Sequence, residues 1–189
     1  QLPGLSLVPG GVVYTWFQGQ WDHIPDLSTV TPSGSGVVAG FDLSVIPTTQ
    51  NFVVRYEGYL QVNEAGTYTF TTTSDDGSML YIGNLPVVSN DGLHGMQTRT
   101  GTVALTPGSY PIRVEFLQYG GGQGLSVAFK TPSGIAGAIP VADLSYDPAR
   151  LPAPREPDLP TGAFNAGLVY EYYEGCLLYT SPSPRDQRG

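Results

Sequence analysis

Apolar and polar residues alternate along most of the middle of the chain. The segment 52–62, FVVRYEGYLQV, places large apolar side chains at most even-numbered positions and mainly polar or small ones between them. A period of two puts one set of side chains on the buried face of a sheet and the other set on its exposed face. No stretch shows a helical period. The pattern therefore predicts strands, and the same period returns in segments 67–72, 110–116 and 125–129.

Short turns separate these predicted strands. Gly83-Asn84 lies between two apolar runs, 78–82 and 85–88, which is typical of a tight hairpin. Asp75-Asp76-Gly77 is expected to reverse the chain as a hairpin too, and TPSGSG at 31–36 is expected to be a loop. Short strands joined in this way indicate an all-β fold, an antiparallel β-sandwich or barrel of jelly-roll type.

The chain divides into a domain and flanking segments. We expect a linker end at 1–7, the β-sandwich at 8–147 and an extended proline-rich linker at 148–165. The segment 166–175, AGLVYEYYEG, repeats GGVVYTWFQG at 10–19 in register. This repeat predicts the truncated start of a second copy of the domain, as in a tandem array.

The last segment, 176–189, has a different character. Its residues CLLYTSPSPRD resemble the translation of a sequencing adapter, so we expect 176–189 to be non-native. Cys176, which is the one cysteine of the chain, belongs to this segment and is therefore discounted as a disulfide partner or reactive thiol.

Charge limits the classes of partner. The chain has 189 residues and a formal net charge of −8, with a pI near 4.4. An acidic protein of this kind is a poor partner for nucleic acid or for an anionic membrane surface. No run reaches the roughly 18 apolar residues that span a bilayer, so we expect no membrane insertion. No obligate protein partner is indicated.

Oxygen-bearing side chains gather at three predicted turns. Asp75 and Asp76 are adjacent, Asn90 lies in the next polar loop, SNDGLHG, and a third loop covers 118–124. Calcium takes roughly six to eight oxygen ligands from carboxylates, amides, backbone carbonyls and water. These residues suit such a site, and they equally suit ordinary turns of Asp, Asn and Gly. His94 is expected to support its loop through backbone contacts.

Several motifs, in order, resemble one known family. VVYTWFQGQWDHIPDL, TYTFTTTSDDGSMLYIGN, VVSNDGLHG and TPGSYPIRVEFLQYGGGQGLSVAF are similar to the PA-fourteen family, the β-sandwich module of the anthrax protective antigen, yeast flocculins and epithelial adhesins. The resemblance covers about 8–147. Segment 166–175 is similar to the opening strand of the family.

The resemblance implies a calcium-dependent sugar site. In lectin members of the family, two aspartates joined by a cis peptide hold calcium, and the calcium holds a hexose; Asp75 and Asp76 match that pair. It also implies Asn90 as an amide ligand, the backbone oxygens of Gly92 and Leu93 as further ligands, and Gln118 as a side chain within reach of the metal. The residues then expected to contact a terminal sugar are Asp75, Asp76, Asn90, Asp91, Gln118, Tyr119, Gly120 and Gln123.

Catalysis has little support in the sequence. Glycoside hydrolysis needs two carboxyl groups on opposite sides of the scissile bond, and neighbouring aspartates in one turn are poorly arranged for that. We therefore expect a non-enzymatic, calcium-dependent carbohydrate-binding module of a secreted or cell-surface protein. Two alternatives stay open: a structural spacer in an extracellular tandem array, and an accessory domain of a glycoside hydrolase.

Overall fold

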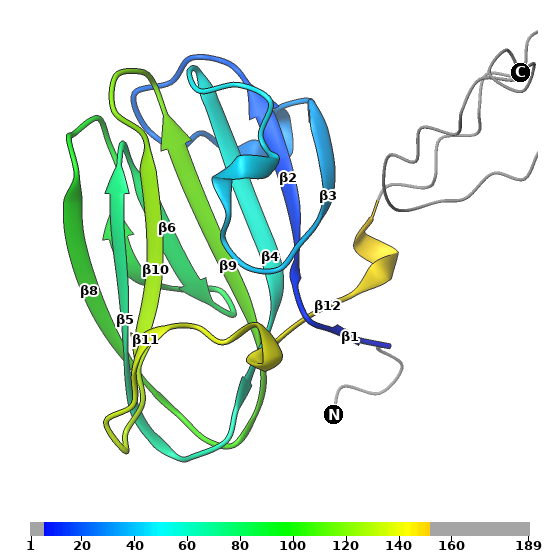
Figure 1. Cartoon of the computed structure of the whole chain (residues 1–189), viewed down its shortest axis with the longest axis vertical. Helices are drawn as coiled ribbons and strands as arrows, with labels where there is room; N and C mark the ends of the chain where they lie inside the picture. Colours follow the sequence, from blue (N-terminus) through cyan, green and yellow to red (C-terminus); the bar gives the residue numbers. More distant parts are fainter. Residues whose placement is uncertain (1–5, 152–189) are drawn as a thin grey trace, which may run out of the picture. The chain divides into compact units, whose positions relative to one another are not determined.

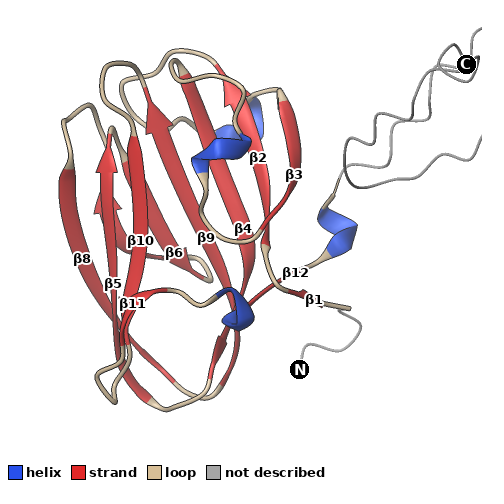
Figure 2. Cartoon of the chain, viewed as in Figure 1, coloured by secondary structure: helices blue, strands red, loops and turns tan. Residues whose placement is uncertain are grey.

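Residues 6–151 of the computed structural model are described, and they form two antiparallel β-sheets packed as a sandwich (Figures 1 and 2). The predicted all-β antiparallel sandwich is confirmed. Within these residues there is no α-helix, and none of the helical turns is long and apolar enough to cross a membrane. The short 3₁₀ turns are η1 (Leu27–Thr29), η2 (Leu43–Val45), η3 (Val141–Asp143) and η4 (Pro148–Arg150).

The larger sheet has eight strands. They run in the order β1-β12-β4-β9-β6-β7, with β2 paired to β4 and β3 paired to β2. Its longest contact joins β4 to β9 over eleven residue pairs, from Phe52↔Gln118 to Val62↔Gly108. The bounds are β1 (Val8–Pro9), β2 (Val12–Gln18), β3 (Gly34–Val38), β4 (Phe52–Val62), β6 (Ser78–Ile82), β7 (Leu85–Asn90), β9 (Gly108–Gln118) and β12 (Leu144–Tyr146).

The smaller sheet has four strands in the order β11-β10-β5-β8. In Figure 1 it covers one face of the larger sheet, and the arrowheads of β5 and β9 point to the same end of the sandwich. That end carries the loops that follow both strands. The bounds are β5 (Gly66–Asp75), β8 (Gln97–Leu105), β10 (Gly124–Lys130) and β11 (Ala136–Ala138).

The core lies between the two sheets. Alternate residues of β4 face it, as the two-residue period predicts, and Tyr68 and Phe70 of β5 meet them from the smaller sheet. A second, smaller cluster lies on the outer face of the larger sheet. It contains Val53 and Leu117, which Phe17 and Leu27 cover together with the half-buried Trp21. The segment between β2 and η1 therefore packs on the outer face of the larger sheet.

Two local predictions are wrong. Residues 34–36, expected as a loop, begin β3, because Gly34 and Gly36 leave room for the rings of Trp16 and Tyr14 on β2; a Cβ at Gly34 would lie 2.5 Å from Trp16 Nε1. Asp75-Asp76-Gly77 is also no hairpin within one sheet. It links β5 of the smaller sheet to β6 of the larger one. The predicted hairpin at Gly83-Asn84 is confirmed.

Several sequence predictions lie outside the described residues. These are the repeat at 166–175, the adapter-like segment at 176–189 and most of the proline-rich linker at 148–165.

Candidate functional site

Three loops meet at one carboxylate at the end of the sandwich. They connect β5 to β6, β7 to β8, and β9 to β10. Asp76, which is 6% exposed, accepts a hydrogen bond at Oδ1 from the backbone N–H of His94 (3.2 Å). Its Oδ2 accepts one from the backbone N–H of Tyr119 (2.9 Å). A single side chain therefore ties the second and third loops to the first.

Asp75 lies beside Asp76 and faces the third loop. The peptide bond between the two aspartates is cis, as the resemblance implies. A Cβ added to Gly122 would lie 2.6 Å from Asp75 Oδ2, so a larger residue at 122 would require the carboxylate to move. Among the hydrogen bonds and ion pairs of residues 6–151, none involves the Asp75 carboxylate. Its charge is thus left without a protein partner in the described part of the chain.

Gln118 reaches the same glycine through its amide nitrogen and leaves its amide oxygen unpaired. It ends β9, is 0% exposed, and donates from Nε2 to the backbone oxygen of Gly122 (2.8 Å). Its Oε1 is buried and has no hydrogen-bond partner. A buried acceptor left unpaired costs about 1–3 kcal/mol, and such an atom calls for a specific explanation, such as an ion or a water. Gln118 Nε2 and the Asp75 carboxylate both approach Gly122, so the amide that carries the unpaired oxygen and the unpaired carboxylate share this glycine as a neighbour.

Asn90, the other predicted amide ligand, is 2% exposed, and both its amide nitrogen and its amide oxygen are hydrogen-bonded within the protein. Its Nδ2 donates to Ser74 Oγ (3.0 Å) and to the backbone oxygen of Gln97 (3.1 Å). Its Oδ1 accepts from Gln97 Nε2 (2.8 Å). The Ser74 hydroxyl is in turn hydrogen-bonded to the Ser78 hydroxyl (2.7 Å), which donates to Thr72 Oγ1 (3.0 Å). Asn90 therefore heads a buried polar chain that supports the site from the interior of the sandwich.

The loop after Asn90 is held by hydrogen bonds within the loop and to the segment before η1. Asp91 Oδ1 accepts from the backbone N–H groups of Ile24 (3.0 Å) and Gly92 (2.8 Å). Gly92 has φ +106° and packs against Gly77, where a Cβ would lie 2.8 Å from the Gly92 backbone. The ring of His94 contacts the backbone oxygens of Gly95 and Asn90, each at 2.9 Å, so its predicted supporting role is confirmed.

The predicted sugar contacts of the third loop are accessible. Tyr119 is 41% exposed, Gln123 is exposed and Gly120 is half-buried. Two features of the site were not predicted. One is Gly122, and the other is Met96, whose methyl group would lie 2.6 Å from a Cβ at Gly124. A methionine in an otherwise polar loop is the only signal that the sequence offered for Met96.

The donor set fits a hard cation. The described residues contain no group of three or more His, Cys, Asp or Glu side chains that could hold a metal ion. A metal at Asp75 and Asp76 would therefore rely on amide and backbone oxygens in addition to the two carboxylates. Calcium accepts such a set, whereas zinc favours nitrogen and sulfur ligands. Among the buried side-chain oxygens of the described residues, Gln118 Oε1 is the one left without a hydrogen-bond partner, and an amide oxygen is a ligand of the kind that calcium accepts.

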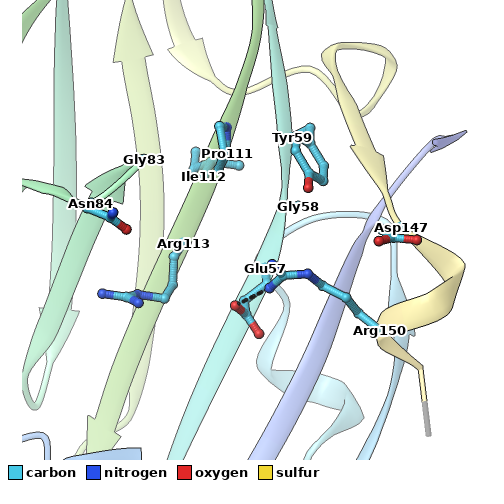
Figure 3. Close-up of a pocket in the computed structure, with 10 residues that line it drawn as sticks. All are labelled: Glu57, Gly58, Tyr59, Gly83, Asn84, Pro111, Ile112, Arg113, Asp147 and Arg150. Atoms are coloured by element: carbon cyan, nitrogen blue, oxygen red, sulfur yellow. Dashed lines mark hydrogen bonds and ion pairs between the residues drawn. The ribbon is translucent and has the colours of Figure 1, made fainter. Parts of the chain in front are cut away.

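Two further hollows lie on the outer face of the larger sheet. Within each of them, acidic side chains form ion pairs with arginines. Glu115 Oε1 accepts from Arg55 Nε (2.8 Å) and lies 3.5 Å from Arg113 Nε. The Arg113 guanidinium stacks on Tyr81 (3.9 Å), and burial raises the pKa of that tyrosine. In the second hollow, shown in Figure 3, Arg150 Nη1 binds Glu57 Oε1 (2.8 Å). Neither hollow leaves an acid unpaired as the loop site does.

Solved structures with the same fold carry related domains. No curated protein sequence is significantly similar to this chain. An anti-sigma factor domain-containing protein matches with a TM-score of 0.62 and 20% identity, over 74% of this chain and 48% of that one, so the chain spans about half of that structure. A PA14 sugar-binding domain from an RTX adhesin matches with a TM-score of 0.58 and 19% identity, over 74% and 99% of the two chains.

A third similar structure is the epithelial adhesin 9 A domain from Candida glabrata in complex with Galβ1-4GlcNAc. Its TM-score is 0.60 at 13% identity, and the match covers 78% of this chain and 93% of that one. At these identities the structures show a common fold. The sequence profile described as PA14 domain matches residues 39–142, which is more than half of the chain. The chain therefore belongs to the PA14 domain family.

Proposed function

We propose that this domain binds a carbohydrate through a calcium ion held by Asp75, Asp76 and Gln118. The single observation that carries the proposal is the buried, unpaired Oε1 of Gln118, whose amide nitrogen binds Gly122, the glycine that the unpaired carboxylate of Asp75 also approaches. Asp76 adds a second carboxylate at the point where the three loops meet. Bound calcium would offer open coordination positions to the hydroxyl groups of a sugar, which replace water as neutral oxygen ligands.

The remaining residues then hold and shape the site. Asn90 ranks below Gln118 as a ligand because its Oδ1 already accepts from Gln97, so we assign it to positioning the loops. Backbone oxygens of the second loop, at Gly92 and Leu93, are proposed to complete the coordination. Asp91, Tyr119, Gly120 and Gln123 flank the sugar in this proposal. The role is binding, not catalysis.

Known relatives support a role in glycan recognition. The RTX adhesin domain is described as sugar-binding, and the Candida glabrata domain was solved with a galactose-containing disaccharide. We propose that the present domain works outside the cell, in a secreted or surface protein. A shallow single site binds weakly, so repeated domains on proline-rich linkers would gain by avidity.

A calcium titration tests the metal site. The full chain is titrated by calorimetry as wild type, as Asp75→Asn, and as Asp22→Asn, a matched change at an exposed aspartate. We expect about one calcium per chain in the wild type and in Asp22→Asn. Asp75→Asn removes a charged ligand, so its affinity should fall by at least about 100-fold.

A glycan array with and without chelator then tests the carbohydrate. Chelator-sensitive binding supports the lectin function. Calcium binding without any glycan would favour the structural spacer, and the absence of calcium binding in a folded wild type would refute the proposed site.

A further inference from the structure

Large apolar side chains are exposed on two of the loops around the candidate site. Leu93 is 46% exposed, Met96 is 59% exposed and Tyr119 is 41% exposed. Eight large apolar side chains are exposed in the described residues, and three of them lie here. Three exposed apolar side chains on the loops of one polar, acidic site suit a ligand that covers them.

Hydrogen bonds place these residues around the two aspartates. Leu93 precedes His94, whose N–H binds Asp76 Oδ1, and the N–H of Tyr119 itself binds Asp76 Oδ2. The backbone next to Leu93 and that of Tyr119 therefore flank one carboxylate. Met96 lies over Gly124, the residue that pairs with Asp75 across β10 and β5. We refer to Leu93, Met96 and Tyr119 as the apolar collar.

Each collar residue can contact a ligand without a large conformational change. Tyr119 presents an aromatic ring with few rotatable bonds. Met96 has an unbranched side chain that adapts to irregular shapes, and Gly124 leaves room for its methyl group. Neither Leu93 nor Met96 is buried by the described residues, so the apolar surface of both is free to be covered.

We propose that the apolar collar selects saccharides that carry a methyl group next to their metal-bound hydroxyl groups. This inference rests on the proposed calcium-dependent sugar site. The methyl group can belong to an N-acetyl substituent or to a 6-deoxy carbon, and the shared chemistry is one apolar group within reach of Leu93, Met96 and Tyr119. Burying one methyl group against the collar corresponds to about fourfold in affinity.

Separate titrations with matched sugars test the selection. The full calcium-loaded chain is titrated with D-galactose, 6-deoxy-D-galactose and N-acetyl-D-galactosamine. We expect at least one methyl-bearing sugar to bind about fourfold or more tightly than galactose, and the tighter one identifies the source of the methyl group. Met96→Ser should reduce that preference to nearly one, with calcium affinity unchanged, because Met96 has no role in the proposed coordination. Leu85→Ser, at a 53% exposed leucine of the β6–β7 hairpin, is the matched control.

Methionine methyl resonances supply a second readout. The chain has two methionines, Met79 and Met96. Met79 lines the hollow on the outer face of the larger sheet that also contains Tyr81 and Arg113. With ¹³C-methyl methionine, the preferred sugar should shift the Met96 resonance and leave that of Met79 in place; Met96→Gln assigns the signals.

The outcomes separate the two proposals. Sugar binding with no preference for a methyl group, or with a shift of Met79 in place of Met96, overturns the collar and leaves the calcium site standing. A folded wild type that binds neither calcium nor sugar overturns both.

Discussion

The loops that follow β7 and β9 begin alike and differ in one respect. Each starts from a buried side-chain amide, Asn90 at 2% exposure and Gln118 at 0%. The amide of Asn90 donates and accepts within the protein, whereas Gln118 leaves its oxygen unpaired. Both side chains end in an amide and both are buried, so neither property separates them. Their hydrogen bonds do differ, and under the proposed function the unpaired oxygen belongs to the ligand and the paired amide to the support.

The aspartates of the two regions, Asp91 and Asp75, differ in the same way in their hydrogen bonds. Asp91 Oδ1 is used by the backbone of Ile24 and Gly92, so this side chain fixes the shape of its loop. Asp75 has no such partner among residues 6–151, and its Oδ2 faces the glycine to which Gln118 also binds. The acid of the first region is therefore used to hold its loop, and the acid of the second is the one that the proposed function assigns to the metal.

The largest effect on stability should come from Asn90→Ala. The change removes three hydrogen bonds, those to Ser74 Oγ, to the Gln97 backbone oxygen and from Gln97 Nε2, and Ser74 Oγ keeps only its bond to Ser78. We expect the free energy of unfolding of the calcium-free protein to fall by about 3 kcal/mol, measured by urea denaturation. A calcium-free stability equal to that of the wild type, together with lost calcium binding, would reverse the roles assigned to Asn90 and Gln118.

Gln118→Met should act on affinity while leaving stability almost unchanged. Methionine has a similar length and removes both the unpaired oxygen and the bond to Gly122. The two changes offset each other, so the calcium-free stability should stay within about 1 kcal/mol of the wild type. Calcium affinity should fall about tenfold, as measured by calorimetry. Gln61→Met, at an exposed glutamine of β4, is the control and should leave the affinity unchanged.

The strands were predictable because their cause is local. A two-residue period needs only the side chains of one segment, and it gave the correct core positions along β4. The course of the chain at Asp75-Asp76-Gly77 was not predictable from the turn itself. A turn within one sheet and a turn between two sheets use the same residue types, and the choice depends on which distant strands pair with β5 and β6.

The ligand set was only partly predictable for a similar reason. The aspartates are adjacent in sequence, so their shared position follows directly. The difference between Asn90 and Gln118 depends on Gln97 and Ser74, which lie on other strands, and no local pattern reports whether a buried amide finds a partner there. Met96 went unnoticed because its role arises from contact with Gly124, 28 residues further along the chain.

The smallest effect should come from Asp91→Asn. Asparagine keeps an Oδ1 that can accept from Ile24 and Gly92, so the loop retains its shape and only the charge is lost. A charge several ångströms from the metal in a hydrated loop contributes about 0.5 kcal/mol, so calcium affinity should fall by only about twofold. Calorimetry beside Asp75→Asn makes the test quantitative, since the two substitutions remove the same charge from two neighbouring loops. Equal losses in the two variants would make Asp91 a ligand and would remove the distinction between the loop that supports and the loop that binds.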